Sequence, residues 1–246
     1  MKIIFKKNLS KEFIWGNVIL FLLIVFSLYS IPQIVQSSAR VSGVTRPTVV
    51  VDPGHGGVDG GASCADGTPE KGINLAIALR LRDFLRSAGY EVIMTRETDI
   101  SIHDASATTI RKKKNSDLHN RLKLAESHPD AIFVSIHQNQ FEQEKYFGCQ
   151  LFYSKNNAQS QTLAGAIDWA VKKQTQPDNK RELKPADSNL FLLWNARIPA
   201  VLVECGFLSN PREAEMLKDE EYQKQMAFAI FCGIEAFWQT ERKTVS

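Results

Sequence analysis

Three runs of apolar, mostly β-branched residues constrain the fold more than any other feature of this 246-residue chain. The first run is Thr48–Val51, and the turn Asp52-Pro53-Gly54-His55-Gly56-Gly57 follows it. The second run is Ala131–Ile136, which is followed by His137. The third run is Ala200–Val203, which is followed by Glu204. Strands that are apolar without alternation are buried on both faces, as in parallel sheets covered by helices. The pattern predicts an α/β fold, a single three-layer domain with a mainly parallel twisted sheet flanked by helices.

The same three runs predict where chemistry takes place. His55, His137 and Glu204 each follow an apolar run, and parallel α/β sheets bind ligands at the carboxyl ends of their strands. A hydrolytic zinc centre needs three nitrogen or oxygen ligands and an open position for water. Glu70 can supply the third ligand, because it begins a predicted helix whose N-terminal dipole favours a charged carboxylate. We therefore predict a metal site formed by His55, Glu70 and His137, with Glu204 left for proton transfer.

An uncharged, mostly apolar stretch lies near the amino terminus. Residues 13–35 are long enough to cross a hydrocarbon core of about 30 Å, and the four lysines before them place residues 1–12 in the cytoplasm. The stretch predicts either a transmembrane anchor or a signal peptide cleaved near Ala39. We expect a linker over residues 36–47, the folded domain over 48–240 and a tail over 241–246. Either alternative makes the domain extracytoplasmic, anchored to the membrane or secreted.

The charge balance argues against a nucleic-acid partner. The first 39 residues hold four Lys and one Glu of the chain's 30 basic and 27 acidic residues, so 26 of each remain in the rest. A domain without net charge has no electrostatic footprint for nucleic acid. The basic run Arg111–Lys114 is interpreted as a solvated loop face.

The four cysteines do not show the spacing of a zinc knuckle. They are Cys64, Cys149, Cys205 and Cys232. In an oxidising compartment three pairings are open to them, but they are scattered and three of the four belong to or adjoin predicted core elements. We expect mostly buried free thiols, since free cysteine behaves as a small apolar residue.

Apolar spacing predicts the remaining elements. A helix over 73–88 ends at a left-handed Gly89 and is followed by a strand over 90–95. Residues 98–115 have no period and are expected to form an irregular surface excursion before a short helix over 118–125. Further expected elements are a strand over 148–154, a helix over 163–171, a polar loop over 177–188, a helix opened by Pro211 and a final helix over 221–238.

Four ordered motifs resemble those of a known family. They are residues 51–57 (VDPGHGG), 70–75 (EKGINL), 135–139 (SIHQN) and 203–210 (VECGFLSN). In order, they resemble the motifs of the zinc-dependent N-acetylmuramoyl-L-alanine amidases, and the likeness spans about residues 48–238. The resemblance implies that His55, Glu70 and His137 bind one zinc ion per chain and that Glu204 is the catalytic carboxylate.

The resemblance also implies the reaction. The substrate is peptidoglycan, and the bond hydrolysed is the amide between the lactyl group of muramic acid and the L-alanine of the stem peptide. Zinc lowers the pKa of water toward about 7. Glu204 is expected to take a proton from this water and to return it to the departing alanine nitrogen.

Several segments resemble the germination-specific subgroup of spore formers, which acts on cortex peptidoglycan. They include the amino-terminal apolar stretch and residues 146–153. Gln138 and Cys149 depart from the more usual residues, which bears on substrate detail and not on the zinc ligands. The subgroup implies muramic-lactam formation jointly with a deacetylase. The sequence leaves open whether an accessory protein takes part.

Other polar residues have less specific expectations. Asp52 is expected to orient a metal ligand or the turn, a role that metal sites usually require. Asn139 is a candidate for substrate binding beside His137. Arg121 and Arg181 could hold carboxylates of the peptide, with surface solvation as the alternative for both.

Two other functions use the same residues differently. A zinc carboxypeptidase or a deacetylase would act on another bond with similar ligands. A non-catalytic wall-binding or regulatory module would keep the fold alone, and the presence of His55, Glu70, His137 and Glu204 argues against it.

Overall fold

The computed structural model describes residues 46–245, with side chains up to residue 242. The predicted basic segment 1–12, the membrane or signal segment 13–35 and nearly all of the linker 36–47 lie outside the described residues. Within residues 46–245, no helix combines the length and the apolar character that a membrane span requires.

Six strands form one sheet in the order β2-β1-β3-β6-β4-β5. They are β1 (Val49–Pro53), β2 (Val92–Met94), β3 (Ile132–Asn139), β4 (Gln150–Tyr153), β5 (Lys184–Pro185) and β6 (Ala200–Phe207). The first four strands of this order are parallel, whereas β4 runs antiparallel to β6 and carries β5 at the edge. The predicted mainly parallel sheet is confirmed.

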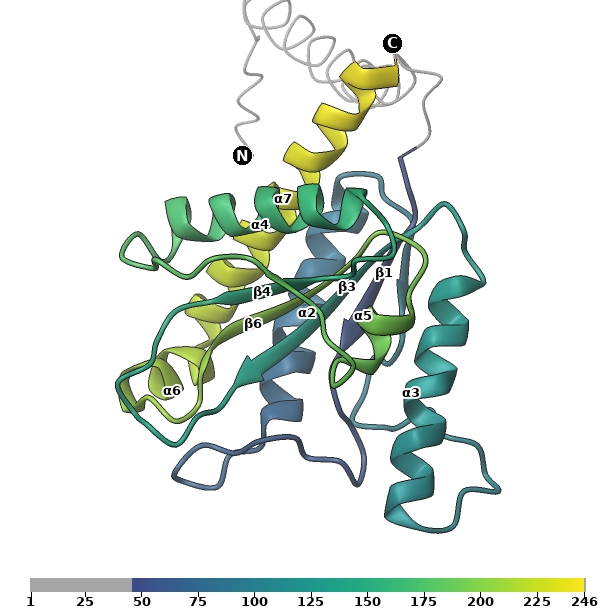
Figure 1. Cartoon of the computed structure of the whole chain (residues 1–246). Coiled ribbons are helices and arrows are strands. Elements are labelled where there is room, and N and C mark those ends of the chain that lie inside the picture. Colours follow the sequence, from purple (N-terminus) through teal and green to yellow (C-terminus); the bar gives the residue numbers. More distant parts are fainter. Residues whose placement is uncertain (1–45, 246) are drawn as a thin grey trace, which may run out of the picture. The chain divides into compact units, whose positions relative to one another are not determined.

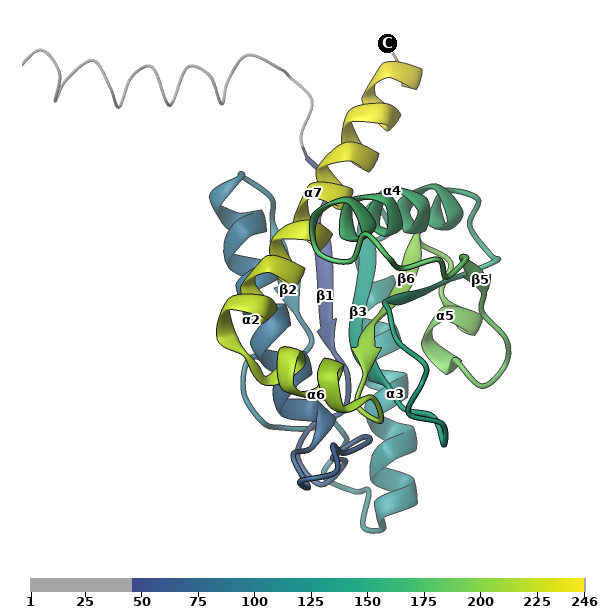
Figure 2. The same ribbon diagram turned by 90° about the vertical axis from the view of Figure 1, so that its left-hand side faces the viewer.

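Helices cover both faces of the sheet (Figures 1 and 2). They are α2 (Glu70–Ser87), α3 (Ile110–Glu126), α4 (Gln159–Gln174), α5 (Phe191–Asn195), α6 (Pro211–Lys218) and α7 (Glu220–Val245). One apolar cluster joins the sheet to α2, α4 and α7, and a second joins the other face to α3 and α5. The two clusters confirm the predicted three layers, because every central strand buries side chains on both of its faces.

The helix α3 begins earlier than the sequence indicates. Residues 110–115, expected to be irregular, form its first turns, and the hydroxyl of Thr109 caps them by accepting a hydrogen bond from the backbone of Lys112 (3.2 Å). The buried residues of α3 are Asp117, Arg121 and Ala125. Its inner face is therefore largely polar, so apolar spacing cannot reveal it.

The strands that carry the candidate site are longer than predicted. His137 lies within β3 and Glu204 within β6, and the two residues are paired across these strands. The sequence did not indicate the short α5 or the two-residue β5. The expected left-handed Gly89 is confirmed (φ 85°). All four cysteines are free thiols, three of them buried, as expected.

Candidate metal centre

A strained turn brings His55 to the edge of the sheet. The turn follows β1, and His55 is the one non-glycine residue among the described ones with a positive φ, at 61°. Such a conformation costs about 1–3 kcal/mol and persists only where surrounding contacts enforce it. Backbone hydrogen bonds between Gly56 and Asp59 (2.9 and 3.1 Å) close the loop after it.

Three side chains from three elements converge here. His55 Nε2 lies 3.3 Å from Glu70 Oε2, and His137 Nδ1 lies 2.9 Å from Glu70 Oε1. One ligand atom from each of the three lies within 4.8 Å of the others. The turn after β1, the first residue of α2 and the strand β3 thus place two imidazoles and one carboxylate where they could hold a single metal ion.

Further hydrogen bonds fix the orientation of these groups. Asp59 Oδ2 lies 2.9 Å from His55 Nδ1, on the ring edge away from Glu70. The Glu70 carboxylate accepts from the side chain of Asn74 (3.0 Å) and from the backbone of Ala62 (2.9 Å). A third donor is the backbone of Gln138 (3.0 Å). Metal ligands are usually held in this way by outer hydrogen bonds.

Sequence reasoning missed Asp59 and Asn74. Each lies four residues after a candidate ligand, Asp59 after His55 and Asn74 after Glu70. For Asn74 this spacing was a usable signal, because residues i and i+4 of a helix lie on the same face.

Two glycines make room for the candidate ligands because they carry no side chain. A Cβ on Gly54 would lie 2.2 Å from the His137 imidazole. A Cβ on Gly61 would lie 2.5 Å from Glu70 Oε2 and 2.7 Å from the His55 ring. Even alanine at either position would displace a candidate ligand.

The electrostatics of the cluster favour a cation. Burial opposes the imidazolium form of His55, but its hydrogen bonds to Asp59 and Glu70 outweigh burial and raise its pKa to about 9. Burial likewise opposes ionisation of Glu70, and the hydrogen bonds of His137 and His55 hold its pKa well below the ordinary value. The negative charges of Asp59 and Glu70 that retain a proton on His55 also attract a metal ion.

Glu204 lies beside the cluster on the neighbouring strand. Its Oε2 atom is buried and has no hydrogen-bond partner among residues 46–245. Burial raises the pKa of this carboxyl group to about 7. A buried carboxyl that lacks a partner calls for a functional explanation, and a pKa near neutrality suits a group that exchanges protons.

Asp52 contacts the turn through Arg121 and touches no candidate ligand side chain. Its carboxylate accepts from Arg121 Nη1 (2.6 Å), Thr95 (2.6 Å) and Ser135 (2.6 Å). Burial opposes its ionisation, but Arg121 and these hydroxyl groups lower its pKa. Arg121 in turn donates to the carbonyl of His55 (2.7 Å). Arg121 is only 1 % exposed, so the alternative of surface solvation was wrong for this residue.

The remaining candidates are distributed as follows. Asn139 is half-buried at the end of β3, where its carbonyl accepts from the backbone of Leu208 (2.8 Å). Arg181 lies beyond α4, in the segment before β5. The other three histidines, His103, His119 and His128, do not belong to the metal-binding cluster that the described residues form.

A mainly parallel α/β sheet whose carboxyl edge carries a His–Glu–His cluster that could hold a metal ion, next to a glutamate with a buried carboxyl oxygen, is typical of hydrolases. The family described as N-acetylmuramoyl-L-alanine amidase matches residues 49–236. The chain belongs to this family and is an enzyme that hydrolyses the muramoyl-L-alanine amide. The resemblance found in the four motifs is thereby confirmed, in preference to the carboxypeptidase, deacetylase and non-catalytic alternatives.

Individual relatives agree with this assignment. The germination-specific N-acetylmuramoyl-L-alanine amidase of Bacillus subtilis is 32% identical over 93% of this chain and 94% of that protein. The AmiA amidase of Escherichia coli is 28% identical over 82% and 80% of the two chains. The CwlD amidase of Clostridioides difficile, solved in complex with the GerS lipoprotein, superimposes with a TM-score of 0.76 at 44% identity, over 79% of this chain and all of that one.

Proposed function

We propose that this amidase is zinc-dependent and that His55, Glu70 and His137 hold one zinc ion per chain. The observation that carries the proposal is the convergence of these three side chains within 4.8 Å. Two nitrogen donors and one oxygen donor are a known ligand set of hydrolytic zinc sites. When bound, zinc supplies Lewis-acid polarisation of the scissile carbonyl and makes water nucleophilic near neutral pH.

Glu204 acts as the proton-transfer group in this proposal. Its Cα is the register partner of His137, so its carboxylate projects beside the ligands rather than among them. With its pKa raised to about 7 by burial, it can take a proton from the attacking water and return it to the nitrogen of L-alanine. Because amines leave poorly as anions, this second transfer is needed for the bond to break.

Asn139 is proposed to bind the substrate. It is half-buried at the same edge of the sheet, two residues after His137. Its side-chain amide can both donate and accept a hydrogen bond, as recognition of an acetamido or peptide group requires. Asp52 is proposed to support the site from a distance, through Arg121 and the His55 turn.

Digestion of purified peptidoglycan by the full-length protein tests the proposed function. Mass spectrometry is expected to find free stem peptides that begin with L-alanine, in the presence of zinc and not after treatment with a chelator. Shortened stems or released acetate would point to a different scissile bond. A correctly folded protein that takes up no stoichiometric zinc under any loading condition would refute the metal assignment.

The biological setting is proposed from the relatives. We infer action on spore-cortex peptidoglycan before germination, because the Bacillus subtilis relative is a germination-specific amidase. A lipoprotein partner is inferred from the complex of the Clostridioides difficile relative. Muramic-lactam content of cortex from a deletion strain tests this setting, and unchanged lactam content would contradict it.

Anchoring through residues 13–35 is proposed as the mode of attachment, and fractionation of membranes tests it.

A further inference from the structure

Arg181 is an arginine that forms no ion pair with the described residues, although its charge acts on Glu213 and works against the burial that raises the pKa of that carboxyl group. Its guanidinium lies over the ring of Phe207, 4.4 Å from the ring centroid. Its Nε donates to the carbonyl of Phe147 (2.8 Å) and its Nη1 contacts Gln150 Oε1 (3.4 Å). No carboxylate in the described part of the chain forms an ion pair with it. These contacts fix the plane of the guanidinium.

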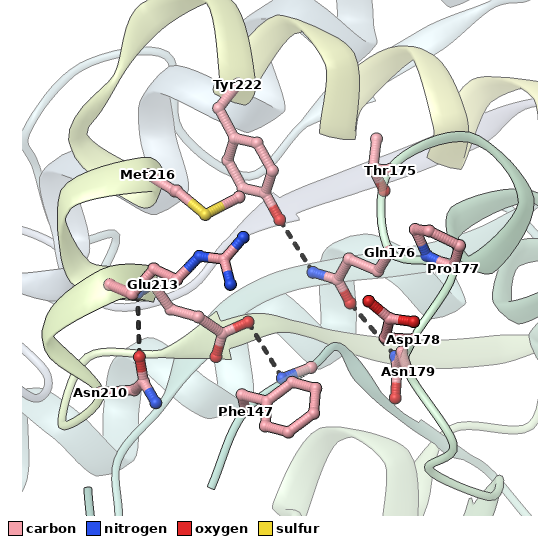
Figure 3. A pocket seen from close by; sticks show the side chains of 12 residues that line it. Phe147, Thr175, Gln176, Pro177, Asp178, Asn179, Asn210, Glu213, Met216 and Tyr222 are labelled. Carbon is pink, nitrogen blue, oxygen red and sulfur yellow. Dashed lines mark hydrogen bonds between the residues drawn. The ribbon is translucent and has the colours of Figure 1, made fainter. Parts of the chain in front are cut away.

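The segment that carries Arg181 is held in place by a buried amide network. The backbone of Arg181 donates to Asn179 Oδ1 (3.0 Å), and Asn179 donates to the carbonyl of Cys149 (2.8 Å). Gln176 links Asn179 (3.1 Å) to the hydroxyl of Tyr222 (2.8 Å), as Figure 3 shows. Arg181 is therefore preorganised rather than free on a loose loop.

The pairing of strands β4, β6 and β3 relates the position of Arg181 to those of Glu204 and His137. Its contact Gln150 is the antiparallel partner of Glu204, and Glu204 is the parallel partner of His137. Directly opposed residues project from the same face of a sheet. With strands about 4.8 Å apart, the backbone of Gln150 lies about 10 Å from that of His137. Arg181, Glu204 and His137 are all of intermediate exposure, and in Glu204 the carboxyl atom Oε2 is buried.

The leaving group of the amidase reaction presents a carboxylate at a matching distance. In the stem peptide, L-alanine is followed by D-glutamate linked through its side chain, which leaves the α-carboxylate of that residue free. A residue spans at most about 3.5 Å, so this carboxylate lies about 7 Å from the scissile nitrogen. This length is comparable with the separation of about 10 Å between the backbones of His137 and Gln150, and the Arg181 guanidinium contacts the Gln150 side chain.

We propose that Arg181 binds the free α-carboxylate of the second stem-peptide residue and so selects peptidoglycan in which this group is not amidated. The assignment rests on the proposed function, because it takes the scissile amide to lie between the His55–Glu70–His137 cluster and Glu204. A planar guanidinium fixed by stacking recognises a carboxylate through two parallel hydrogen bonds. Arg181 is thus a specificity-determining residue.

Paired substrates test the proposal. The full-length, zinc-loaded protein is assayed on glycan strands whose stem peptides carry D-glutamate with the α-carboxylate either free or amidated. The free acid is expected to be cleaved with a kcat/KM about 10- to 100-fold higher, the effect of a hydrogen bond to a charged group. The substitution Arg181→Gln is expected to bring this ratio close to one, mainly through KM, and Arg181→Lys to restore part of it. Lys180→Gln, an exposed neighbouring cation, is the matched control and should retain the wild-type ratio.

The possible outcomes distinguish a failure of the Arg181 subsite from a failure of the proposed zinc-amidase function. A wild-type ratio near one, or an Arg181→Gln enzyme that keeps the wild-type ratio, overturns the subsite while leaving the amidase mechanism intact. A loss of the ratio in Lys180→Gln would also overturn it, because general surface charge would then explain the preference. If the zinc-loaded wild type released no alanine-terminated peptide from either substrate, the proposed function itself would fail.

Discussion

Arg121 donates a 2.7 Å hydrogen bond to the carbonyl oxygen of His55, so a helix on one face of the sheet holds the backbone of a candidate metal ligand. The same guanidinium donates to the carboxylates of Asp52 and Asp117, at 2.6 Å each, and to the carbonyl of Pro53 (2.9 Å). All of these groups are paired, which compensates for burying the charges. The left-handed φ of His55 is maintained by these contacts.

Replacement of Arg121 is therefore expected to weaken both the fold and the metal site. Arg121→Ala leaves Asp52 buried without its cationic partner, a change that costs about 3–5 kcal/mol of unfolding free energy. Arg121→Lys keeps the charge but cannot reach all four acceptors, so a well-folded protein with reduced zinc affinity is expected. Chemical denaturation and zinc competition with a chromophoric chelator measure the two effects. Arg111→Ala, at an exposed position of the same helix, is the control, and an equal effect there would contradict the explanation.

Substitution of Glu204 is expected to separate chemistry from metal binding. Glu204→Gln keeps the shape of the side chain but removes its capacity to exchange a proton, so kcat should fall by about 10²- to 10⁴-fold. Zinc stoichiometry should remain that of the wild type, because Glu204 lies outside the cluster of candidate ligands. Hydrolysis of purified wall and elemental analysis of the same preparation provide the measurement. Wall hydrolysis at the wild-type rate would exclude Glu204 as the proton-transfer group.

Much of this site could be predicted from sequence because its side chains follow strongly patterned elements. His55, His137 and Glu204 come at the ends of apolar runs and Glu70 at a helix start, positions that the topology of a parallel sheet brings to one edge. The direction of β4 could not be predicted in the same way, since a strand has the same apolar pattern whether it runs parallel or antiparallel.

The burial of Arg121 could not be predicted either. Its partner Asp52 lies 69 residues away in the sequence, and apolar spacing records only where hydrophobic side chains are buried. A helix with a polar inner face therefore has the sequence pattern of a solvated one, and only the tertiary structure shows that the arginine is enclosed.

Zinc affinity is expected to rise with pH through the neutral range. In the metal-free protein the hydrogen bonds of His55 to Asp59 and Glu70, working against burial, raise its pKa to about 9. His55 thus stays protonated below that pH, and zinc must displace one proton to bind. Affinity should increase about tenfold for each pH unit between 6.5 and 9 and level off above. Competition titrations at fixed ionic strength across this interval test the slope, and an affinity independent of pH would show that no proton is displaced.

The raised pKa of His55 makes the stability of the metal-free protein fall with rising pH, whereas it makes zinc affinity rise. A group whose pKa is higher in the folded state stabilises that state fully below its unfolded pKa, near 6.5, and loses this contribution as pH rises through about 9. The metal-free protein is therefore expected to lose stability over this interval, while zinc stabilises the protein increasingly. Thermal unfolding with and without zinc at pH 6.5 and 8.5 measures both trends. A zinc-induced shift in Tm that shrinks with rising pH would contradict the assignment of His55 as a ligand.

Gly54 is expected to be indispensable for the metal site. The Cβ of Gly54→Ala would lie 2.2 Å from two atoms of the His137 imidazole, well inside van der Waals contact. His137 must then rotate or β1 must move, and in either case the imidazole leaves Glu70. We expect a loss of zinc binding of at least about 100-fold, since a ligand displaced by 1 Å no longer meets the bond length that zinc requires.

Gly72→Ala provides the matched control, because its Cβ meets no atom within 4 Å and its position in α2 favours alanine by about 1 kcal/mol. That variant should be slightly more stable and bind zinc normally. If Gly54→Ala bound zinc as tightly as Gly72→Ala, His137 could not be a ligand in the orientation that the fold gives it.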